Sequence, residues 1–439
     1  MILERAVFHL KMGIILCLTR EDNAMNIKKQ IRSLYFYEII SGLQIVDAVW
    51  VFFLLERGFS LTQVGIAEGV FHGVSMCFEI PSGMISDTLG RRRTLMAAGL
   101  MSAVSALCML VSGNFFLILV SMGLNAISYN LVSGTREALT YDSLLEVGQQ
   151  ERYLMVSSRQ DFIYQGMFAL TSLMSLATVT LGYEKSYLLA VFRGLLCFFA
   201  AAALTEARIK PGTGHEIRTD AREAAEIDTK RKADKRNNGL GLLFREIRNH
   251  FLQALKLLRN HKIVAGRMSL IALISSGDYI VYMMLQEHLV AVGLSPEFLG
   301  IPLLMISLCT MAGALLAEKT AGLSLKKVSM IGGLGGGIFL ALSGGNSLIL
   351  CVLAAGAAHC LGEVTVLRME SENQKNFESS FRATMVSVGS MFYSIVMTVL
   401  SPISGLIAEK TSMLGAFLCL GILTALGALY FILSGLSEP

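Results

Sequence analysis

The chain has 439 residues, of which 54% are hydrophobic and only 16% are charged. Soluble domains carry about 25% charged residues, so this composition excludes an ordinary soluble protein and indicates one that crosses a membrane. The net charge of +4 does not argue for nucleic-acid binding, and the eight cysteines are scattered without metal-ligand spacing. We therefore expect no nucleic-acid partner, no metal and no cofactor.

Residues 1–24 hold one apolar patch that is too short to span a bilayer and is not followed by a signal-peptide cleavage site. The basic sequence MNIKKQIRS begins at Met25 and leads into the first long apolar stretch. We expect translation to start at Met25 and residues 1–24 to be an unstructured extension.

Apolar stretches separated by polar breaks predict twelve membrane-spanning helices of about 20 residues each. They fall near residues 33–55, 61–84, 94–112, 115–138, 153–180, 186–206, 264–289, 297–317, 327–344, 347–368, 382–406 and 412–434. The expected fold is an all-α membrane protein with an N-terminal six-helix bundle over residues 25–206 and a C-terminal one over 263–439. Lys and Arg gather in alternate loops, including Arg91–Arg93, and this asymmetry predicts that both termini are cytoplasmic.

Residues 207–262 form a hydrophilic bridge between the two bundles. Its first part has the composition of a solvated linker. In its second part, apolar residues such as Leu243, Ile247 and Phe251 share one helical face and basic residues occupy the other. This pattern predicts an amphipathic helix that lies either on the cytoplasmic membrane surface or on the protein's own loops.

The two halves of the chain repeat each other. GFSLTQVGI at 58–66 is echoed by GLSPEFLGI at 293–301, and RYLMVS at 152–157 is echoed by RATMVS at 382–387, with nearly equal separations. Two halves of like orientation joined by a bridge are typical of transporters built from parallel repeats.

A charged segment at 79–93, EIPSGMISDTLGRRR, separates the second and third predicted helices. Gly83 is expected to allow close helix approach and Gly90 to adopt a positive φ angle. Asp87 lies four residues before Arg91, within pairing reach.

In these residues the sequence resembles the major facilitator superfamily of secondary transporters. The positions that match the family's signature turn are Gly83, Asp87, Gly90, Arg91 and Arg92. Together with SGTREALTYDSL at 133–144, the segment is similar to a bacterial branch of drug and small-molecule permeases. The resemblance covers nearly all of 25–434 and implies a monomer in the bacterial inner membrane with a small-molecule substrate. The proline-containing motif that drug–proton antiporters carry in helix 5 is absent.

The resemblance also implies a latch on the cytoplasmic side. Its residues would be Asp87, Arg91 and Arg92 of the turn with Arg136, Glu137, Asp142 and Arg382. The arginines of the turn would pair with Glu137 or Asp142, and Asp87 would approach the N-terminus of helix 11, whose dipole favours an anion. These contacts are expected only when the two halves close on the inner side.

Charged residues within predicted spans are costly, about 3 kcal/mol each on insertion scales, so each is a functional candidate. Asp47 in helix 1 and Asp278 in helix 7 lie at nearly equivalent positions of the repeat. They either line the transport path or have their hydrogen-bonding and ion-pair partners within their own halves. Glu38, nearer the cytoplasmic end, is expected to reach the membrane interface.

Helix 2 carries Glu68 and His72 one turn apart, a pair that could pass a proton or form a structural hydrogen bond. Asn125 in helix 4 shares a face with Ser121 and Ser128, which suits a wetted cavity wall. No nucleophile–base constellation or phosphate-binding loop is present in the sequence, so we expect no enzyme.

These features predict a secondary transporter that works by alternating access and couples protons to the export of small amphipathic compounds. An importer or uniporter of a small metabolite is the first alternative. A membrane sensor or lipid-handling protein on the same scaffold, without transport, is the second.

Overall fold

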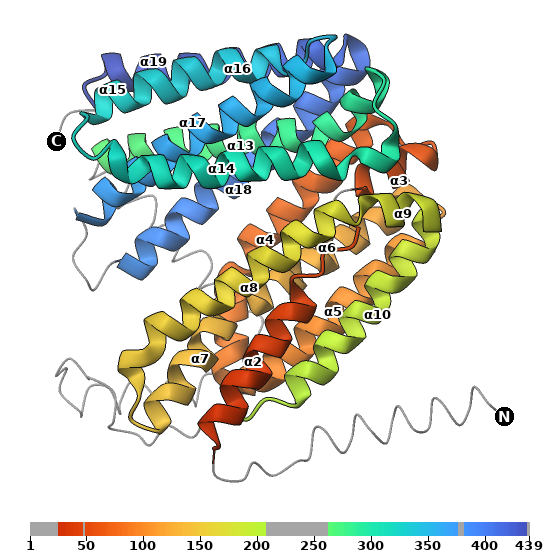
Figure 1. Cartoon of the computed structure of the whole chain (residues 1–439), viewed down its shortest axis with the longest axis vertical. Helices are drawn as coiled ribbons and strands as arrows, with labels where there is room; N and C mark the ends of the chain where they lie inside the picture. The colour runs from red at the N-terminus through yellow and green to blue at the C-terminus, as the bar shows by residue number, and fades with distance from the viewer. Residues whose placement is uncertain (1–24, 47–48, 208–261, 376–381, 437–439) are drawn as a thin grey trace, which may run out of the picture.

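The computed structural model describes residues 25–46, 49–207, 262–375 and 382–436, and every regular element in these ranges is helical (Figure 1). The N-terminal extension, Asp47 and the predicted amphipathic helix lie outside the described residues.

The helices form two sequential groups. The N-terminal half comprises α2 (Ile27–Ser41), α3 (Trp50–Glu56), α4 (Leu61–Leu89), α5 (Arg91–Leu110), α6 (Phe115–Val132), α7 (Thr135–Glu146), α8 (Tyr153–Leu173), α9 (Ser175–Leu181) and α10 (Tyr183–Ala202). The C-terminal half comprises α13 (Lys262–Ala291), α14 (Gly300–Lys319), α15 (Leu325–Ser329), α16 (Gly336–Leu342), α17 (Leu348–Lys375), α18 (Arg382–Lys410) and α19 (Met413–Leu433). A π-helical turn, Met330–Gly335, joins α15 to α16 in the glycine-rich run.

Helical segments occupy each of the twelve predicted stretches, and the expected all-α membrane fold is confirmed. Within the described residues, nine helices are long and apolar enough to cross a membrane. The first, second and fifth predicted spans are not among these nine. The first and fifth are each divided between two helices, α2 with α3 and α8 with α9, and the second, α4, carries three acids and a proline within its length.

The prediction of one continuous first helix was wrong, because α2 ends at Ser41 and α3 begins at Trp50. Neighbouring helices satisfy the carbonyl groups that the break frees. Arg193 Nη1 donates to the Ser41 carbonyl at 3.0 Å, and Thr171 Oγ1, which donates to the Met167 carbonyl at 2.7 Å, also lies 3.4 Å from the Gly42 carbonyl oxygen. Broken helices are stable at membrane depth where such side chains replace the lost backbone partners.

Two predicted boundaries also differ. The segment 79–93 is not an extended turn, since α4 continues to Leu89 and α5 begins at Arg91. Only Gly90 separates them, with the predicted positive φ, +91°. Helix α6 ends at Val132, so Arg136 and Glu137 do not close it but lie in the first turn of α7, after Gly134 at φ +73°.

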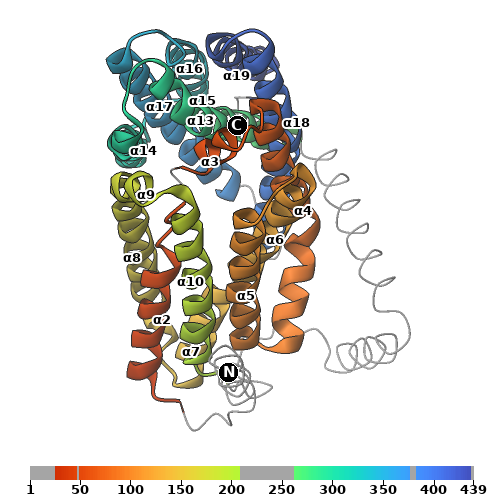
Figure 2. The ribbon, with the colours of Figure 1, turned by 90° about the vertical axis from the view of Figure 1, so that its right-hand side faces the viewer.

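The two halves meet at one end of the bundle and diverge toward the other (Figures 1 and 2). We call the end that carries Gly90 and α7 the basic end. We call the end formed by the start of α4 and the end of α18 the sealed end. Helices α4 and α18 pack against each other across the two halves, and α3 with α13 and α8 with α14 add to the interface.

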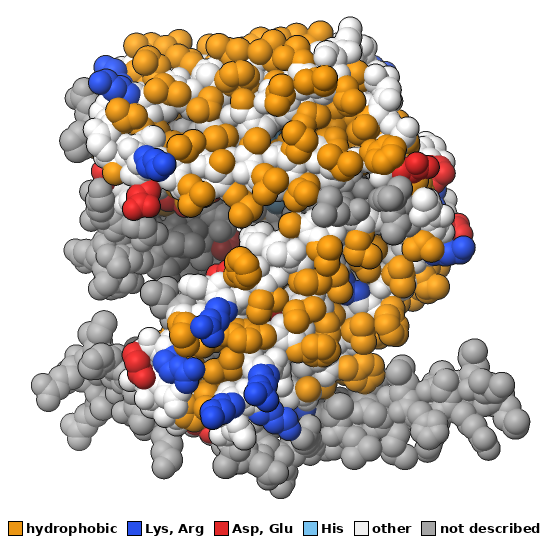
Figure 3. Space-filling model, viewed as in Figure 1, with side chains coloured by type: hydrophobic (Ala, Val, Ile, Leu, Met, Phe, Trp, Pro, Cys, Tyr) orange, Lys and Arg blue, Asp and Glu red, His pale blue; other side chains and the backbone are white. Residues whose placement is uncertain are grey.

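Hydrophobic side chains cover the sides of both halves in the view of Figure 3. Large apolar residues such as Phe116, Leu315 and Ile349 are more than two-thirds exposed. A soluble protein rarely exposes so extended an apolar surface, whereas lipid tails cover it at no cost. The chain is therefore an integral membrane protein that crosses the bilayer several times.

Glycines hold the N-terminal half together where α5 crosses α10. A Cβ added at Gly194 would lie 2.5 Å from the Ala103 amide nitrogen, and one at Gly99 would lie 2.5 Å from that of Phe198. The two backbones therefore touch. Because the nearest atoms belong to the backbone, no change of side-chain rotamer can remove the clash that a substitution would create.

We predict that Gly194→Leu lowers the free energy of unfolding by about 1–3 kcal/mol, because the new side chain forces these backbones apart. Thermal unfolding of the purified protein in detergent micelles measures the effect. Gly166→Leu is the matched control, since a Cβ at that helical position meets nothing within 4 Å. Equal melting temperatures for the two variants would contradict the prediction.

Candidate functional site

A cavity of about 1360 Å³ lies between the two halves. It is lined mainly by α4, α5 and α6 of the N-terminal half and by α13, α17 and α18 of the C-terminal half. Its lining reaches the basic end through Asp87, Arg91 and Glu137 on one side and Glu370 and Asn373 on the other. The cavity is therefore open between the diverging halves.

The opposite end is closed by close helix contact between α4 and α18. A Cβ at Gly65 would collide with the carbonyl group of Ser401, and one at Gly405 would collide with that of Leu61. The missing side chains allow the two backbones to touch. None of the residues from 57 to 64 or from 405 to 412 lines the cavity.

A carboxylate strengthens this closure. Glu409, near the end of α18, accepts hydrogen bonds from the backbone N–H of Thr62, at 3.3 Å, and from the Thr62 hydroxyl. Thr62 lies in the first turn of α4, where free N–H groups and the helix dipole favour an anion. The contact joins the two halves at the sealed end.

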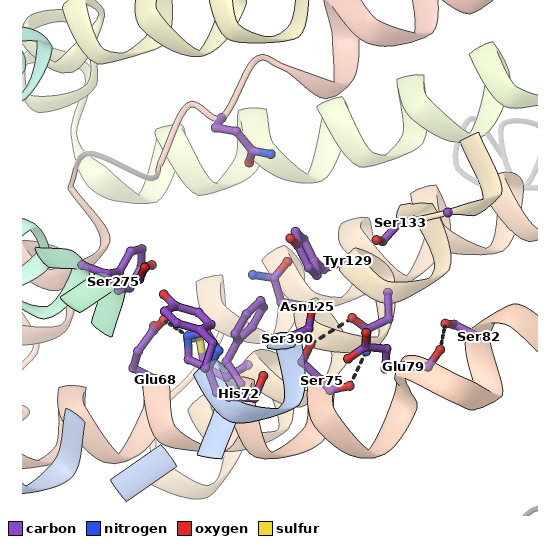
Figure 4. A pocket seen from close by; sticks show the side chains of 18 of the residues that line it. Glu68, His72, Ser75, Glu79, Ser82, Asn125, Tyr129, Ser133, Ser275 and Ser390 are labelled. Atoms are coloured by element: carbon purple, nitrogen blue, oxygen red, sulfur yellow. Dashed lines mark hydrogen bonds and ion pairs between the residues drawn. The ribbon is translucent and has the colours of Figure 1, made fainter. Parts of the chain in front are cut away.

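Glu68 and His72 meet halfway along the cavity, as their one-turn spacing on α4 predicted (Figure 4). His72 Nε2 lies 3.2 Å from Glu68 Oε1, and both side chains are less than 10% exposed. The imidazole also stands edge-on to the rings of Tyr393 and Tyr279 in the C-terminal half, with centroids 5.2 and 6.3 Å away. The pair therefore lies at the junction of the two halves.

Asp278 of α13 also lines the cavity, next to α17. A Cβ at Gly362 would collide with the Asp278 carboxylate, so this glycine makes room for the acid. Glu363 follows Gly362 on α17 and also lines the cavity. Asn125 lines the N-terminal wall near Tyr129 (Figure 4).

Sequence reasoning missed the aromatic lining. The tyrosines that line the cavity are Tyr129, Tyr164, Tyr187, Tyr279, Tyr282 and Tyr393. A tyrosine inside an apolar stretch resembles a core residue, so no local pattern singles these out. Only the spacing of 279 and 282, which places them on one helical face, could have signalled a shared role.

The predicted latch differs from its expected form. Arg91 pairs with Asp142, as one of the two expected partners, and its guanidinium lies 3.9 Å from Asp87. All three residues belong to the N-terminal half, and the pairs form although the basic end is open. The prediction that these contacts need the halves to close was therefore wrong for Arg91, because α7 carries Asp142 beside α5.

Arg92 and Asp87 also differ from the expected latch. Arg92 is buried and donates from Nη2 to the Ala202 carbonyl at 2.9 Å. Asp87 is 71% exposed, and a Cβ at Gly83 meets nothing within 4 Å, so no helix approaches closely there in this conformation. The side chain of Arg382, at the first residue of α18, lies outside what the structure describes.

Arg136 forms a cluster that the sequence did not predict. Its guanidinium lies 3.2 Å from carboxylate oxygens of Glu38, Glu137 and Asp161. Glu38 is fully buried and also accepts a hydrogen bond from Gln160 Nε2 at 3.4 Å. The expectation that Glu38 reaches the membrane interface was wrong, because α7 and α8 cover it.

Comparisons with known proteins agree with this architecture. Residues 39–371 match the family model of the Major Facilitator Superfamily. A sequence comparison with curated proteins finds no match. Among solved structures, the nucleoside transporter NupG is similar with a TM-score of 0.70 at 13% identity, covering 94% of this chain and 100% of that one. A POT family transporter in complex with 5-aminolevulinic acid is similar with a TM-score of 0.63 at 15% identity, covering 93% and 95%.

We predict that Gly65→Leu separates the two halves at the sealed end, because a side chain cannot fit against the Ser401 carbonyl. Spin labels on cysteines introduced at Glu56 and Thr411, in a cysteine-free background, would show a longer distance than in the unsubstituted protein. Gly113→Leu is the control, since that site has open space. An unchanged distance in Gly65→Leu would contradict the proposed closure.

Proposed function

Because the chain belongs to the Major Facilitator Superfamily, we propose that it is a secondary active transporter that couples protons to the export of small amphipathic compounds by alternating access. The observation that carries this proposal is a cavity that is sealed at one end and open at the other. A solute can enter from only one side of such a cavity, and closing the open end while parting α4 from α18 would expose it to the other side.

The basic end is the cytoplasmic end in this proposal. Loops on the cytoplasmic side of a membrane protein are enriched in Lys and Arg. This positive-inside rule is obeyed when Arg91–Arg93 and α7 face the cytoplasm of a bacterium. Both termini then lie inside the cell, and the present conformation is the inward-open state of a monomer in the inner membrane.

Proton coupling is supported by titratable groups at the junction of the halves. Glu68 and His72 face the tyrosines of the other half, and Asp278 stands on the opposite wall of the same cavity. A proton taken up at these groups changes the charge that α4 and α13 present to each other and to a solute. Asp47, outside the described residues, is the expected counterpart of Asp278 in the first half.

Import of a polar metabolite is the second candidate. It is favoured by the names of the similar structures, a nucleoside transporter and a POT family transporter, and by the hydrogen-bonding groups of the cavity. Everted membrane vesicles separate the two candidates. Substrate accumulation driven by protons leaving an acidic vesicle lumen means export from the cell, and proton-coupled release of preloaded substrate from that lumen means import. No flux of any solute tested favours a sensor or lipid-handling protein.

We predict that Asp278→Asn abolishes proton-driven accumulation in everted vesicles, because the amide keeps the shape of the carboxylate but cannot take up a proton. The measurement is uptake with and without an imposed pH gradient. Glu297→Gln, an exposed acid outside the cavity, should retain full flux. Undiminished pH-driven flux in Asp278→Asn would remove this residue from the coupling mechanism.

Asp87 is proposed to act in the other conformation. When the cytoplasmic end closes, the carboxylate would meet the N-terminus of α18, which belongs to the other half. We therefore predict that Asp87→Asn shifts the population toward the inward-open state. The ratio of inward-open to outward-open molecules should rise by up to about tenfold if the lost contact with α18 contributed about 1.4 kcal/mol. Labelling of a cysteine introduced at Ser133, an exposed residue of the cavity wall near the basic end, should become faster, and an unchanged rate would argue against the latch.

A further inference from the structure

We infer that the solutes recognised by this cavity are organic cations with an aromatic or apolar body. The inference rests on the proposed transport function and deepens it, since it concerns which chemical class the cavity selects. Its basis is the charge of the lining, the aromatic rings beside the charges, and a pair of neighbouring acids.

The lining is acidic although the protein is basic. Seven carboxylates line the cavity against two arginines, whereas the whole chain carries a net charge of +4. The carboxylates are Glu68, Glu79, Asp87, Glu137, Asp278, Glu363 and Glu370. Negative charge is thus concentrated here against the trend of the rest of the molecule, and charges act strongly in a cavity with low-dielectric walls.

The two arginines offset only part of this charge where a solute would bind. Arg91 lies at the mouth and is held by Asp142. Arg193 directs its guanidinium to the Ser41 carbonyl and, at 2.8 Å, to Ser102 Oγ, where it supports the broken first helix. An anionic solute would therefore meet repulsion along most of the wall.

Aromatic rings accompany the acids. Six of the chain's twelve tyrosines and its only tryptophan line the cavity, together with Phe71. Ring faces attract cations at distances up to about 6 Å and also cover apolar surface. Tyr279 and Tyr393 surround His72 beside Glu68, so rings and carboxylates occur together.

Asp278 and Glu363 are the proposed anchors for the positive charge. Both line the cavity, and Glu363 directly follows Gly362, the residue of α17 that packs against the Asp278 carboxylate of α13. No lysine or arginine within the described residues forms an ion pair with either one within 4.0 Å. Two neighbouring acids of this kind repel one another, and a bound cation relieves the repulsion.

The test measures equilibrium binding to the full-length protein in detergent micelles, using the fluorescence of Trp50, the only tryptophan and a lining residue. The probes are tetraphenylphosphonium and tetraphenylborate, which share shape and size but carry opposite charges. We expect a saturable change with the cation, with a dissociation constant at least about tenfold lower than that of the anion.

Variants locate the site. Asp278→Asn and Glu363→Gln should each raise the dissociation constant of tetraphenylphosphonium about tenfold, and Glu297→Gln should leave it unchanged. The comparison of the two ions needs no variant, so it decides the matter even if a substitution impairs folding. Equal or tighter binding of tetraphenylborate, no saturable change with either ion, or unchanged cation binding in both cavity variants would overturn the inference.

The two proposals fail separately. Binding needs no gradient, so cation binding without flux in everted vesicles would reject transport while supporting the cation site. Proton-driven flux of neutral or anionic solutes by a protein that does not bind tetraphenylphosphonium would reject the cation site alone.

Discussion

Contact between α4 and α18 at the sealed end is the constraint on which the arrangement of the two halves depends. Gly65 and Gly405 bring the two backbones together, and Glu409 ties the start of α4 to the end of α18. Because these helices come from different halves, their approach at one end and divergence at the other create the cavity. In the proposed transport cycle, opening this end must part the contact, so its strength would help to set the relative stability of the two states.

Charged groups are divided between two tasks. Arg136 gathers Glu38, Glu137 and Asp161 within the N-terminal half, and Arg193 supports the break between α2 and α3. These partly buried guanidinium groups hold irregular backbone and neighbouring helices in place, and they face partners of their own half. Of the acids of the cavity wall, Glu137 belongs to the Arg136 cluster, whereas Asp278 and Glu363 form no ion pair with a lysine or arginine of the described residues. That difference is what separates a structural charge from one available to a solute.

Family membership and the layout of helices followed from the sequence because both depend on features that are local or nearly so. Apolar length marks each helix, the distribution of Lys and Arg orients the loops, and Gly90 at positive φ follows from the residue type in a one-residue turn. The pairing of Glu68 with His72 follows equally from helix geometry, since residues four apart share one face. These statements need no knowledge of how distant segments pack.

What only the tertiary structure decided depends on contacts between distant segments. The first helix breaks because side chains from α8 and α10 satisfy its freed carbonyls, which no apolar count can foresee. Arg91 finds Asp142 within its own half because α7 folds back beside α5, so this pair forms without the closure of the halves that the resemblance led us to expect. The sequence by itself determined the family, the helices and the residues able to carry charge. The packing of those helices decided which charges hold the fold together and which face the cavity.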